Sequence, residues 1–298
     1  MKLLISLFIV QCTTILLSLF NLVSRKTMIN VLRFSYGFFL IFSGFVKILD
    51  PLGFSYKLQE YFEVFICAPD GERSWIGHAI SRHQKLRPVQ KDDAFSCQAY
   101  SLNGTPADCV NFAIGNLLPR EPDLVISGIN LGYNVTLPMI LSSGTVGAAL
   151  EGSLLGVRSF ASSMSLPVES FEEIRENLGK VDGEIGESLR HAAHKTAFYA
   201  KEWLHHSDRE GLQVHNLNFP SNFDGKDNPI LSFAGSLKLG SLFQKVENED
   251  YHQLFYDPAW LEQNEPEIGS DLWVLEQGKP TVSRLNFADI AGRKHLQP

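Results

Sequence analysis

The sequence predicts an α/β fold with a mostly parallel sheet, a C-terminal β-hairpin and an apolar, helical N-terminal segment. Short apolar runs that suit buried strands alternate with longer runs of helical spacing, an order typical of βαβ units. The first 63 residues carry six basic and three acidic side chains, whereas the 298-residue chain has a net charge of −7. This change of composition divides the chain into an N-terminal segment, residues 1–63, and a globular domain, residues 64–298.

Two apolar runs dominate the N-terminal segment. Leu3–Ser24 holds no charged residue and is long enough to cross a bilayer, and Phe34–Val46 is short but rich in Phe. Cations flank both runs, which favours a membrane anchor over residues 3–49. Two alternatives are a signal peptide, although no small-residue cleavage site follows the first run, and a pair of buried core helices.

The globular domain continues with alternating strands and helices. The run over residues 123–127 is nearly all apolar, as in a strand covered on both faces, and Gly128 and Gly132 are expected to end it. We expect strands over residues 64–68, 97–102, 123–127, 157–161 and 212–219, and helices over residues 108–118, 145–155 and 184–206. The last helix has its inner side formed by Leu189, Ala192, Ala193, Ala197 and Ala200.

The C-terminal part of the chain is less regular. Residues 220–257 are polar and rich in loop-forming residues, which suits a flap. Residues 273–285 predict a β-hairpin that turns at Gly278, and the tail after residue 286 is expected to be irregular.

Charge and cysteine usage exclude several classes of function. A net charge of −7 argues against binding to a nucleic-acid duplex, which requires a basic face. The four cysteines contain no closely spaced pair, so neither a zinc site nor a thioredoxin-like motif is indicated. We expect a cytoplasmic body with reduced thiols, held at a membrane if the N-terminal segment is an anchor.

Polar residues follow the expected strands over residues 64–68 and 123–127. Further polar residues lie at the start of the helix expected over residues 145–155. In open α/β sheets, ligands bind beyond the carboxyl ends of the strands. Ser74 follows the first strand, Asn130 and Asn134 follow the strand over residues 123–127, and the Ser143–Thr145 turn opens the next helix. The N–H groups of a helix start attract anions, and hydroxyl and amide oxygens suit Mg²⁺ or Mn²⁺. The pattern therefore points to phosphate chemistry with a divalent metal, which would polarise the phosphoryl group and activate water.

Five segments in order resemble the SurE family of metal-dependent nucleotide phosphatases. They are APDGERSWIGHAIS, GTPADCV, PDLVISGINLGYN, SGTVGAALEG and GSDLWVLEQGKPTVSRL, and the likeness covers about residues 64–285. The resemblance implies a Rossmann-like domain, a divalent metal, hydrolysis of nucleoside monophosphates, and dimers or tetramers built through swapped C-terminal elements.

The resemblance also assigns roles to individual residues. It implies that Ser74 and Asn130 are catalytic metal ligands. The phosphate-side wall is implied to be Asn134, Ser143, Gly144 and Thr145, and the loop that borders the site is implied to contain Gly104, Thr105 and Asp108. Simpler interpretations remain open: Asn130 as a turn cap, the Ser143–Thr145 turn as a helix cap only, and Asp108 as a surface acid near a helix start. Glu151 is expected to be structural.

One departure from the family pattern concerns the metal. The family begins with a strand that ends in Asn-Asp-Asp-Gly, and those two carboxylates hold the ion, but no Asp or Glu precedes Asp50 in this chain. Asp50 ends the apolar run FVKIL and is the one early carboxylate that could restore part of the site. Residues 30–63, around FSGFVK and DPLG, instead resemble the first transmembrane segment of DoxX-type membrane proteins.

Three functions follow from these observations. The leading expectation is a metal-dependent nucleotidase that is impaired by loss of the acidic pair. The alternative is a catalytically inactive, membrane-held module that binds nucleotides or only oligomerises. The third is a membrane fragment of DoxX type with an incidental soluble tail, which accounts for the smallest part of the chain.

Overall fold

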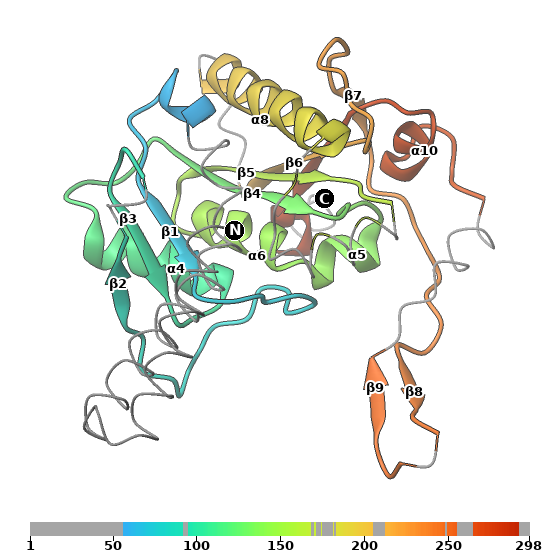
Figure 1. The fold of residues 1–298 in the computed structure, drawn as a ribbon, viewed down its shortest axis with the longest axis horizontal. Coiled ribbons are helices and arrows are strands. Elements are labelled where there is room, and N and C mark those ends of the chain that lie inside the picture. Colours follow the sequence, from blue (N-terminus) through green and yellow to red (C-terminus); the bar gives the residue numbers. More distant parts are fainter. Residues whose placement is uncertain are drawn as a thin grey trace, which may run out of the picture.

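A computed structural model gives the fold of residues 56–91, 95–167, 170, 174, 181, 183–204, 212–247, 249–254 and 265–291 (Figure 1). The strands are β1 (Ile66–Pro69), β2 (Pro88–Gln90), β3 (Ala99–Leu102), β4 (Leu124–Leu131), β5 (Arg158–Met164), β6 (Gln213–Phe219), β7 (Ile230–Ser232), β8 (Phe243–Lys245), β9 (His252–Leu254) and β10 (Thr281–Asn286). The helices are α4 (Pro106–Phe112), the π-helix η2 (Ala113–Leu117), α5 (Leu137–Ser142), α6 (Gly144–Leu154), α8 (Gly183–Leu204), α10 (Asp271–Glu276) and the 3-10 helix η3 (Phe287–Ala291).

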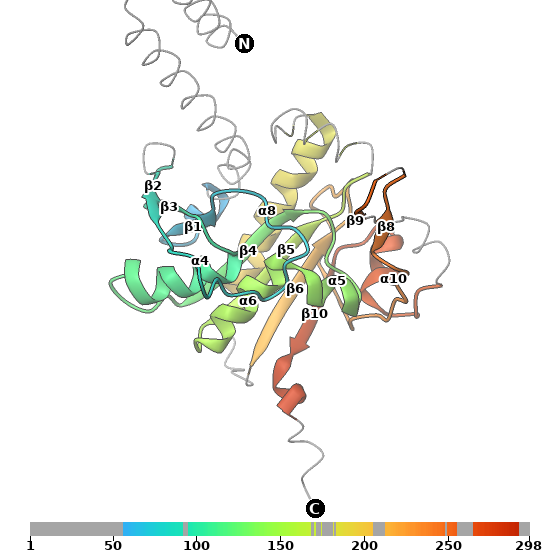
Figure 2. The ribbon, with the colours of Figure 1, turned by 90° about the horizontal axis from the view of Figure 1, so that it is seen from below.

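The largest sheet has five strands in the order β4-β5-β6-β10-β7. β4, β5 and β6 run parallel, β10 is antiparallel to β6, and β7 is parallel to β10. Helices cover both faces, with α8 on one side and α5 and α6 on the other (Figures 1 and 2). The expected α/β fold with a predominantly parallel sheet is therefore confirmed.

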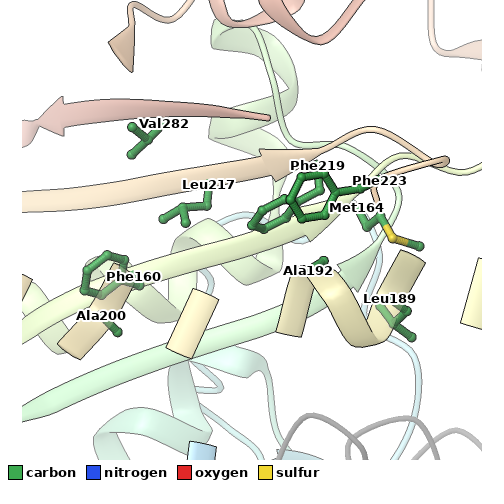
Figure 3. Packing of buried hydrophobic residues seen from close by; sticks show 9 residues of the cluster. All are labelled: Phe160, Met164, Leu189, Ala192, Ala200, Leu217, Phe219, Phe223 and Val282. Carbon is green, nitrogen blue, oxygen red and sulfur yellow. The ribbon is translucent and has the colours of Figure 1, made fainter. Parts of the chain in front are cut away.

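Side chains that alternate along β5 and β6 build two separate core layers. Phe160, Met164 and Leu217 point toward α8, where they pack against its Leu189 and its alanines (Figure 3). On the other face, Ala161 and Val214 pack against Val146 and Ala149 of α6. Because both faces are covered, every residue of β5 and β6 except the first is buried, as expected for a doubly covered parallel strand.

The expected long amphipathic helix is confirmed as α8. All five residues predicted for its inner side are buried, and they recur at helical spacing. The small alanine side chains allow the helix to lie close to the sheet. The strands expected over residues 64–68, 97–102, 157–161 and 212–219 are present as β1, β3, β5 and β6, with no end shifted by more than three residues.

A second, smaller sheet has the order β1-β3-β2. β1 and β3 are parallel and β2 is antiparallel to β3. In the part of the chain that the structure describes, this sheet and the five-stranded sheet remain separate, because β1 and β4 share no ladder. Both of these strands are only half-buried despite their apolar sequences. Among the described strands, the single sheet that the sequence predicts is thus divided in two.

Two sequence-based expectations about local structure were wrong. Gly128 does not end the third expected strand: β4 runs on to Leu131, with an irregular register between Ser127 and Asn130. Residues 273–285 do not form a hairpin, because Ser270 caps the helix α10, Gly278 follows it with a φ of 69°, and β10 comes next. The helix expected over residues 108–118 begins earlier, at Pro106, and continues as the π-helix η2.

The membrane anchor predicted over residues 3–49, residues 30–55 of the DoxX-like segment, and Asp50 all lie outside the described residues and stay predictions. No helix among the residues that the structure does describe is long and apolar enough to span a membrane. The flap expected over residues 220–257 contains the short strand β7 and the two-stranded ribbon β8-β9.

Candidate functional site

The loop after β1 carries Ser74, and α4 anchors it. The Arg73 guanidinium donates from Nε to the Gly104 carbonyl oxygen at 3.2 Å and from Nη2 to the Asp70 carboxylate at 3.0 Å. Further along the loop, the hydroxyl of Thr105 donates to the Ala79 carbonyl oxygen at 2.6 Å. Residues 104 and 105 therefore border the loop that bears Ser74, and their role toward a ligand stays a prediction.

Asp108 uses both carboxylate oxygens to hold backbone N–H groups. Oδ1 accepts from the Ser81 N–H at 3.0 Å, and Oδ2 accepts from the Thr105 N–H at 2.8 Å. Thr105 Oγ1 in turn accepts from the Asp108 N–H, which completes a capping box at the start of α4. Burial raises the pKa of Asp108, but the hydrogen bonds from Ser81 and Thr105 outweigh burial and hold the pKa below its usual value. Asp108 positions the loop, and because it is buried, the simpler interpretation of a surface acid near a helix start is wrong about its exposure.

The start of α6 lies against this loop. Ser143 is the N-cap, and its Oγ accepts from the Val146 N–H at 3.1 Å. A Cβ added at Gly144 would lie 3.2 Å from the Arg73 carbonyl oxygen and 3.1 Å from Ile76 Cγ2, so glycine allows the close approach. The structure thus brings the Ser74 loop and the Ser143–Thr145 turn together. The first N–H groups of this 11-residue helix have no partner within the helix, and such groups bind anions.

Glu151 joins three elements beneath the loop. Its Oε2 lies 2.6 Å from His78 Nε2, and its Oε1 accepts from Asn111 Nδ2 at 2.7 Å. The carboxylate is almost fully buried on α6 and links α4 and the loop after β1 to that helix. This supports the structural role expected for Glu151.

Asn130, on β4, and Ser74, in the loop after β1, each donate a hydrogen bond to a residue two positions away in the chain. Asn130 Nδ2 donates to the Gly132 carbonyl oxygen at 2.7 Å, and Ser74 Oγ donates to Glu72 Oε1 at 2.7 Å. Gly128, which precedes Asn130 on β4, has a φ of 121°, and a Cβ there would collide with the Ser162 carbonyl oxygen. Glycine therefore lets β4 approach β5 closely just before Asn130. The role of each residue toward a ligand stays a prediction.

Asn134 is the centre of a buried polar network. Its Nδ2 donates to Ser163 Oγ at 2.8 Å, its N–H donates to Asn218 Oδ1 at 2.7 Å, and its carbonyl oxygen accepts from Asn216 Nδ2 at 2.7 Å. Asn216 and Asn218 were not predicted from the sequence. The alternation of asparagines in HNLNF on a core strand was the available signal, since buried amides must find partners.

The loop after this network is strained and polar. Thr136 has a φ of 65°, an uncommon value for a β-branched residue, and it is buried. Its N–H donates to Asp271 Oδ2 at 3.0 Å, while Asp271 Oδ1 accepts from the N–H groups of Gly235 and Leu272. Burial raises the pKa of Asp271, and these hydrogen bonds counteract it only in part. Asp271 thereby ties the start of α10 to the loop before α5.

The described donors do not by themselves fit a divalent metal ion. Ser74 and Asn130 are neutral, whereas a hard cation prefers carboxylate oxygens. Among the residues that the structure describes, no three His, Cys, Asp or Glu side chains come together as a metal site requires. Asp50, the early carboxylate that could restore part of the metal site, lies outside this part of the chain, so we derive no catalytic step through a metal.

Comparison with known proteins gives one consistent result. The family model described as Survival protein SurE matches residues 47–235. A protein from Pelotomaculum thermopropionicum named 5'-nucleotidase SurE is 31% identical over 246 residues, which cover 80% of this chain and 85% of that protein. A protein of the same name from Caldanaerobacter subterraneus is 29% identical over 237 residues, which cover 78% of this chain and 84% of that protein.

A solved structure supports the fold independently. The crystal structure of the SurE protein from Aquifex aeolicus superposes with a TM-score of 0.59 at 24% identity, covering 78% of this chain and 86% of that one. The family match begins at residue 47, so it also takes in residues 47–63 of the DoxX-like segment.

Proposed function

The chain belongs to the SurE family, and we propose that it hydrolyses the phosphate ester of nucleoside monophosphates between the Ser74 loop and the start of α6. The observation that carries this proposal is the likeness to proteins named 5'-nucleotidase SurE over about four-fifths of the chain. The approach of the Ser74 loop to the start of α6 supports the proposal. It brings the Ser74 hydroxyl and the backbone N–H groups of α6 together as donors for a phosphate.

In this proposal the chain's own residues bind and orient the phosphate. The N–H groups of Gly144 and Thr145 and the positive end of the α6 dipole hold the phosphoryl oxygens. We propose that the Ser74 hydroxyl and the Asn130 amide face the ester beyond the carboxyl ends of β1 and β4. A divalent metal supplies water activation in this chemistry, but the described residues fit it poorly, and the proposed activity is correspondingly weak.

The test is release of inorganic phosphate from a panel of 5'- and 3'-mononucleotides, with and without Mn²⁺. We expect slow, Mn²⁺-dependent release that Asn130→Ala abolishes and Thr145→Val lowers. Asn116→Ala, at the end of the π-helix and away from the loop, is the matched control and should leave the rate unchanged. Unchanged release in Asn130→Ala, or full release in excess chelator, would show the proposal to be wrong.

The alternative function is nucleotide binding without turnover. The incomplete metal donor set favours this alternative. A mononucleotide that raises the melting temperature while no phosphate is released would establish it.

We also propose that the protein forms dimers or tetramers through the ribbon β8-β9. The ribbon extends away from the body (Figure 1), and a two-stranded ribbon is only marginally stable alone in water. Its side chains Phe243, Tyr251 and Leu254 are 60%, 53% and 41% exposed, so a second copy would bury apolar area there.

The oligomer prediction is tested by light scattering after size exclusion. The unmodified protein should elute as a dimer or larger, and Phe243→Ser should shift it toward the monomer. Ile290→Ser, which also removes an exposed apolar side chain but lies in η3, should leave the mass unchanged. A monomeric unmodified protein would contradict the prediction.

A further inference from the structure

The segment between β1 and β2 carries a strong local positive charge. Residues 73–91 contain five Arg or Lys residues and no Asp or Glu, although the whole chain has a net charge of −7. Three of these cations, Arg82, Lys85 and Arg87, lie within six consecutive residues, 82–87, which we call the basic loop. All three residues are exposed. None of them belongs to the phosphate or metal residues of the proposed function.

Hydrogen bonds to Asn103 hold the basic loop in a defined conformation. The Arg87 N–H donates to Asn103 Oδ1 at 2.6 Å, and Asn103 Nδ2 donates to the Lys85 carbonyl oxygen at 3.1 Å. Gln84 Nε2 also donates to the Asn103 carbonyl oxygen. These bonds use only backbone groups of Lys85 and Arg87, so both charged groups stay available for a ligand. Because the loop backbone is already ordered, binding a ligand there costs little conformational entropy.

The cations of the basic loop have no acidic partner in the part of the chain that the structure describes. None of the ion pairs among the described residues includes Arg82, Lys85 or Arg87. The next acids along the chain, Asp92 and Asp93, lie outside the described residues. A cluster of like charges without counter-charges attracts an anion of matching size.

The basic loop lies next to the candidate phosphate site. A Cβ added at Gly104 would lie 3.0 Å from Leu86 Cδ2, and one added at Gly144 would lie 3.1 Å from Pro106 Cγ. The basic loop therefore contacts the start of α4, and the start of α4 contacts the start of α6. Figure 1 shows the segment between β1 and β2 passing α6 on its way to β2. An anion held at the start of α6 thus has the basic loop as a close neighbour.

We propose that the basic loop binds the phosphodiester backbone of a short single-stranded oligonucleotide, while the terminal phosphate of the same strand lies at the start of α6. The inference rests on the proposed function, because it takes that phosphate site as given and extends the substrate class from mononucleotides to phosphorylated oligonucleotide ends. The guanidinium groups of Arg82 and Arg87 can each donate two hydrogen bonds to one phosphate, and Lys85 adds a compact charge.

A short single strand fits this surface better than a duplex or a membrane does. Six residues span at most about 20 Å, so the basic loop can contact only a few phosphates. The net charge of −7 repels a long polyanion from the rest of the surface. A flexible strand can bring its terminal phosphate to α6 while its next phosphates reach the loop. The adjacent phosphate site favours such a strand over a lipid surface, which presents its charges in one plane.

The experiment measures binding of a thymidine hexamer that carries a 5'-phosphate and a fluorescent label at its 3' end. The full chain is titrated onto the hexamer in excess chelator, which suppresses hydrolysis, and fluorescence anisotropy gives the affinity. With three phosphates neutralised, the affinity should fall about twentyfold between about 50 and about 200 mM NaCl, a logarithmic slope of about −2. Removing the 5'-phosphate should weaken binding.

Substitutions in the basic loop locate the contact. Arg87→Gln should weaken hexamer binding and make the salt slope shallower by about 0.7, whereas Arg87→Lys should keep the slope. Lys201→Gln is the matched control, because it removes one charge from α8, which lies on the other face of the sheet from α6 (Figures 1 and 2). This control should change neither the affinity nor the slope.

Three results would overturn the inference. One is an equal loss of affinity in Lys201→Gln and Arg87→Gln, because the attraction would then be spread over the whole surface. Another is equal affinity for the hexamer with and without its 5'-phosphate. The third is binding to phosphatidylserine vesicles that Arg87→Gln removes, without binding to the hexamer, which would assign the loop to a membrane surface.

Failure of this inference can be distinguished from failure of the proposed function. Release of phosphate from mononucleotides without any hexamer binding would refute the inference alone. Salt-dependent hexamer binding that requires Arg87 and the 5'-phosphate, without any release of phosphate, would support the oligonucleotide site and refute the proposed hydrolysis.

Discussion

The protein is expected to hydrolyse a 5'-mononucleotide at least about a thousandfold more slowly than the Caldanaerobacter subterraneus relative assayed beside it in the same Mn²⁺ buffer. The reason is the donor set. Ser74 and Asn130 contribute neutral oxygens, and no Asp or Glu precedes Asp50. Metal stabilisation of a phosphoryl transition state is worth several kcal/mol, and each ~1.4 kcal/mol is about tenfold in rate.

Equilibrium dialysis measures Mn²⁺ binding directly. It shows whether the slow hydrolysis results from weak metal affinity or from another part of the site. We expect weak binding to accompany the slow rate. Turnover equal to that of the relative would contradict the prediction and would mean that another carboxylate holds the ion. Loss of both Mn²⁺ binding and turnover in Asp50→Asn would then identify Asp50 as that carboxylate. Glu72→Gln, which changes the carboxylate bonded to Ser74, is the comparison variant.

The parts of the fold that could be predicted from the sequence are those in which a strong residue pattern extends over many positions. The buried alanines of α8 recur at helical spacing from Ala192 to Ala200 within a helix of 22 residues, and this periodicity is independent of what the helix packs against. The helix α6 and the strands β4, β5 and β6 were also predicted from local patterns. An apolar run that is bounded by glycine, or that leads from a strand into a helix, is compatible with few other secondary structures. The candidate phosphate turn was found because its residues are adjacent in the chain.

What the sequence could not predict depends on distant contacts. Trp273, Val274 and Leu275 favour a strand locally, but the Ser270 cap and the ties of Asp271 to Gly235 and Thr136 make the segment a helix. The amide network joins Asn134 to Asn216 and Asn218, which lie 82 and 84 positions further along the chain. No local pattern reports such pairings. The capping box of Thr105 and Asp108, in contrast, has a sequence signature, T-P-A-D, that was available.

Below about pH 6.5 the folded state is expected to lose stability through one buried imidazole, that of His215. His215 lies on β6 and is 1% exposed. The rings of Phe160, Tyr199 and Trp203 surround it, the last with its centroid 4.1 Å away. Burial, together with the nearby charges of Arg284 and Arg158, lowers the pKa of His215 from 6.5 to about 4.

The sign of the effect follows from proton uptake. Between pH 6.5 and about 4 the unfolded chain binds a proton at this histidine and the folded protein does not, so the stability present above pH 6.5 is lost as the pH falls. The loss between about pH 7.5 and about pH 4 should be about 3 kcal/mol. Urea unfolding of the unmodified protein and of His215→Gln at both pH values measures it, because only the unmodified protein carries this contribution. His252→Gln, on the exposed strand β9, is the matched control and should show the full pH dependence. If His215→Gln lost as much stability on acidification as the unmodified protein, groups other than this imidazole would control the acid response, and the aromatic cage around it would be serving packing alone.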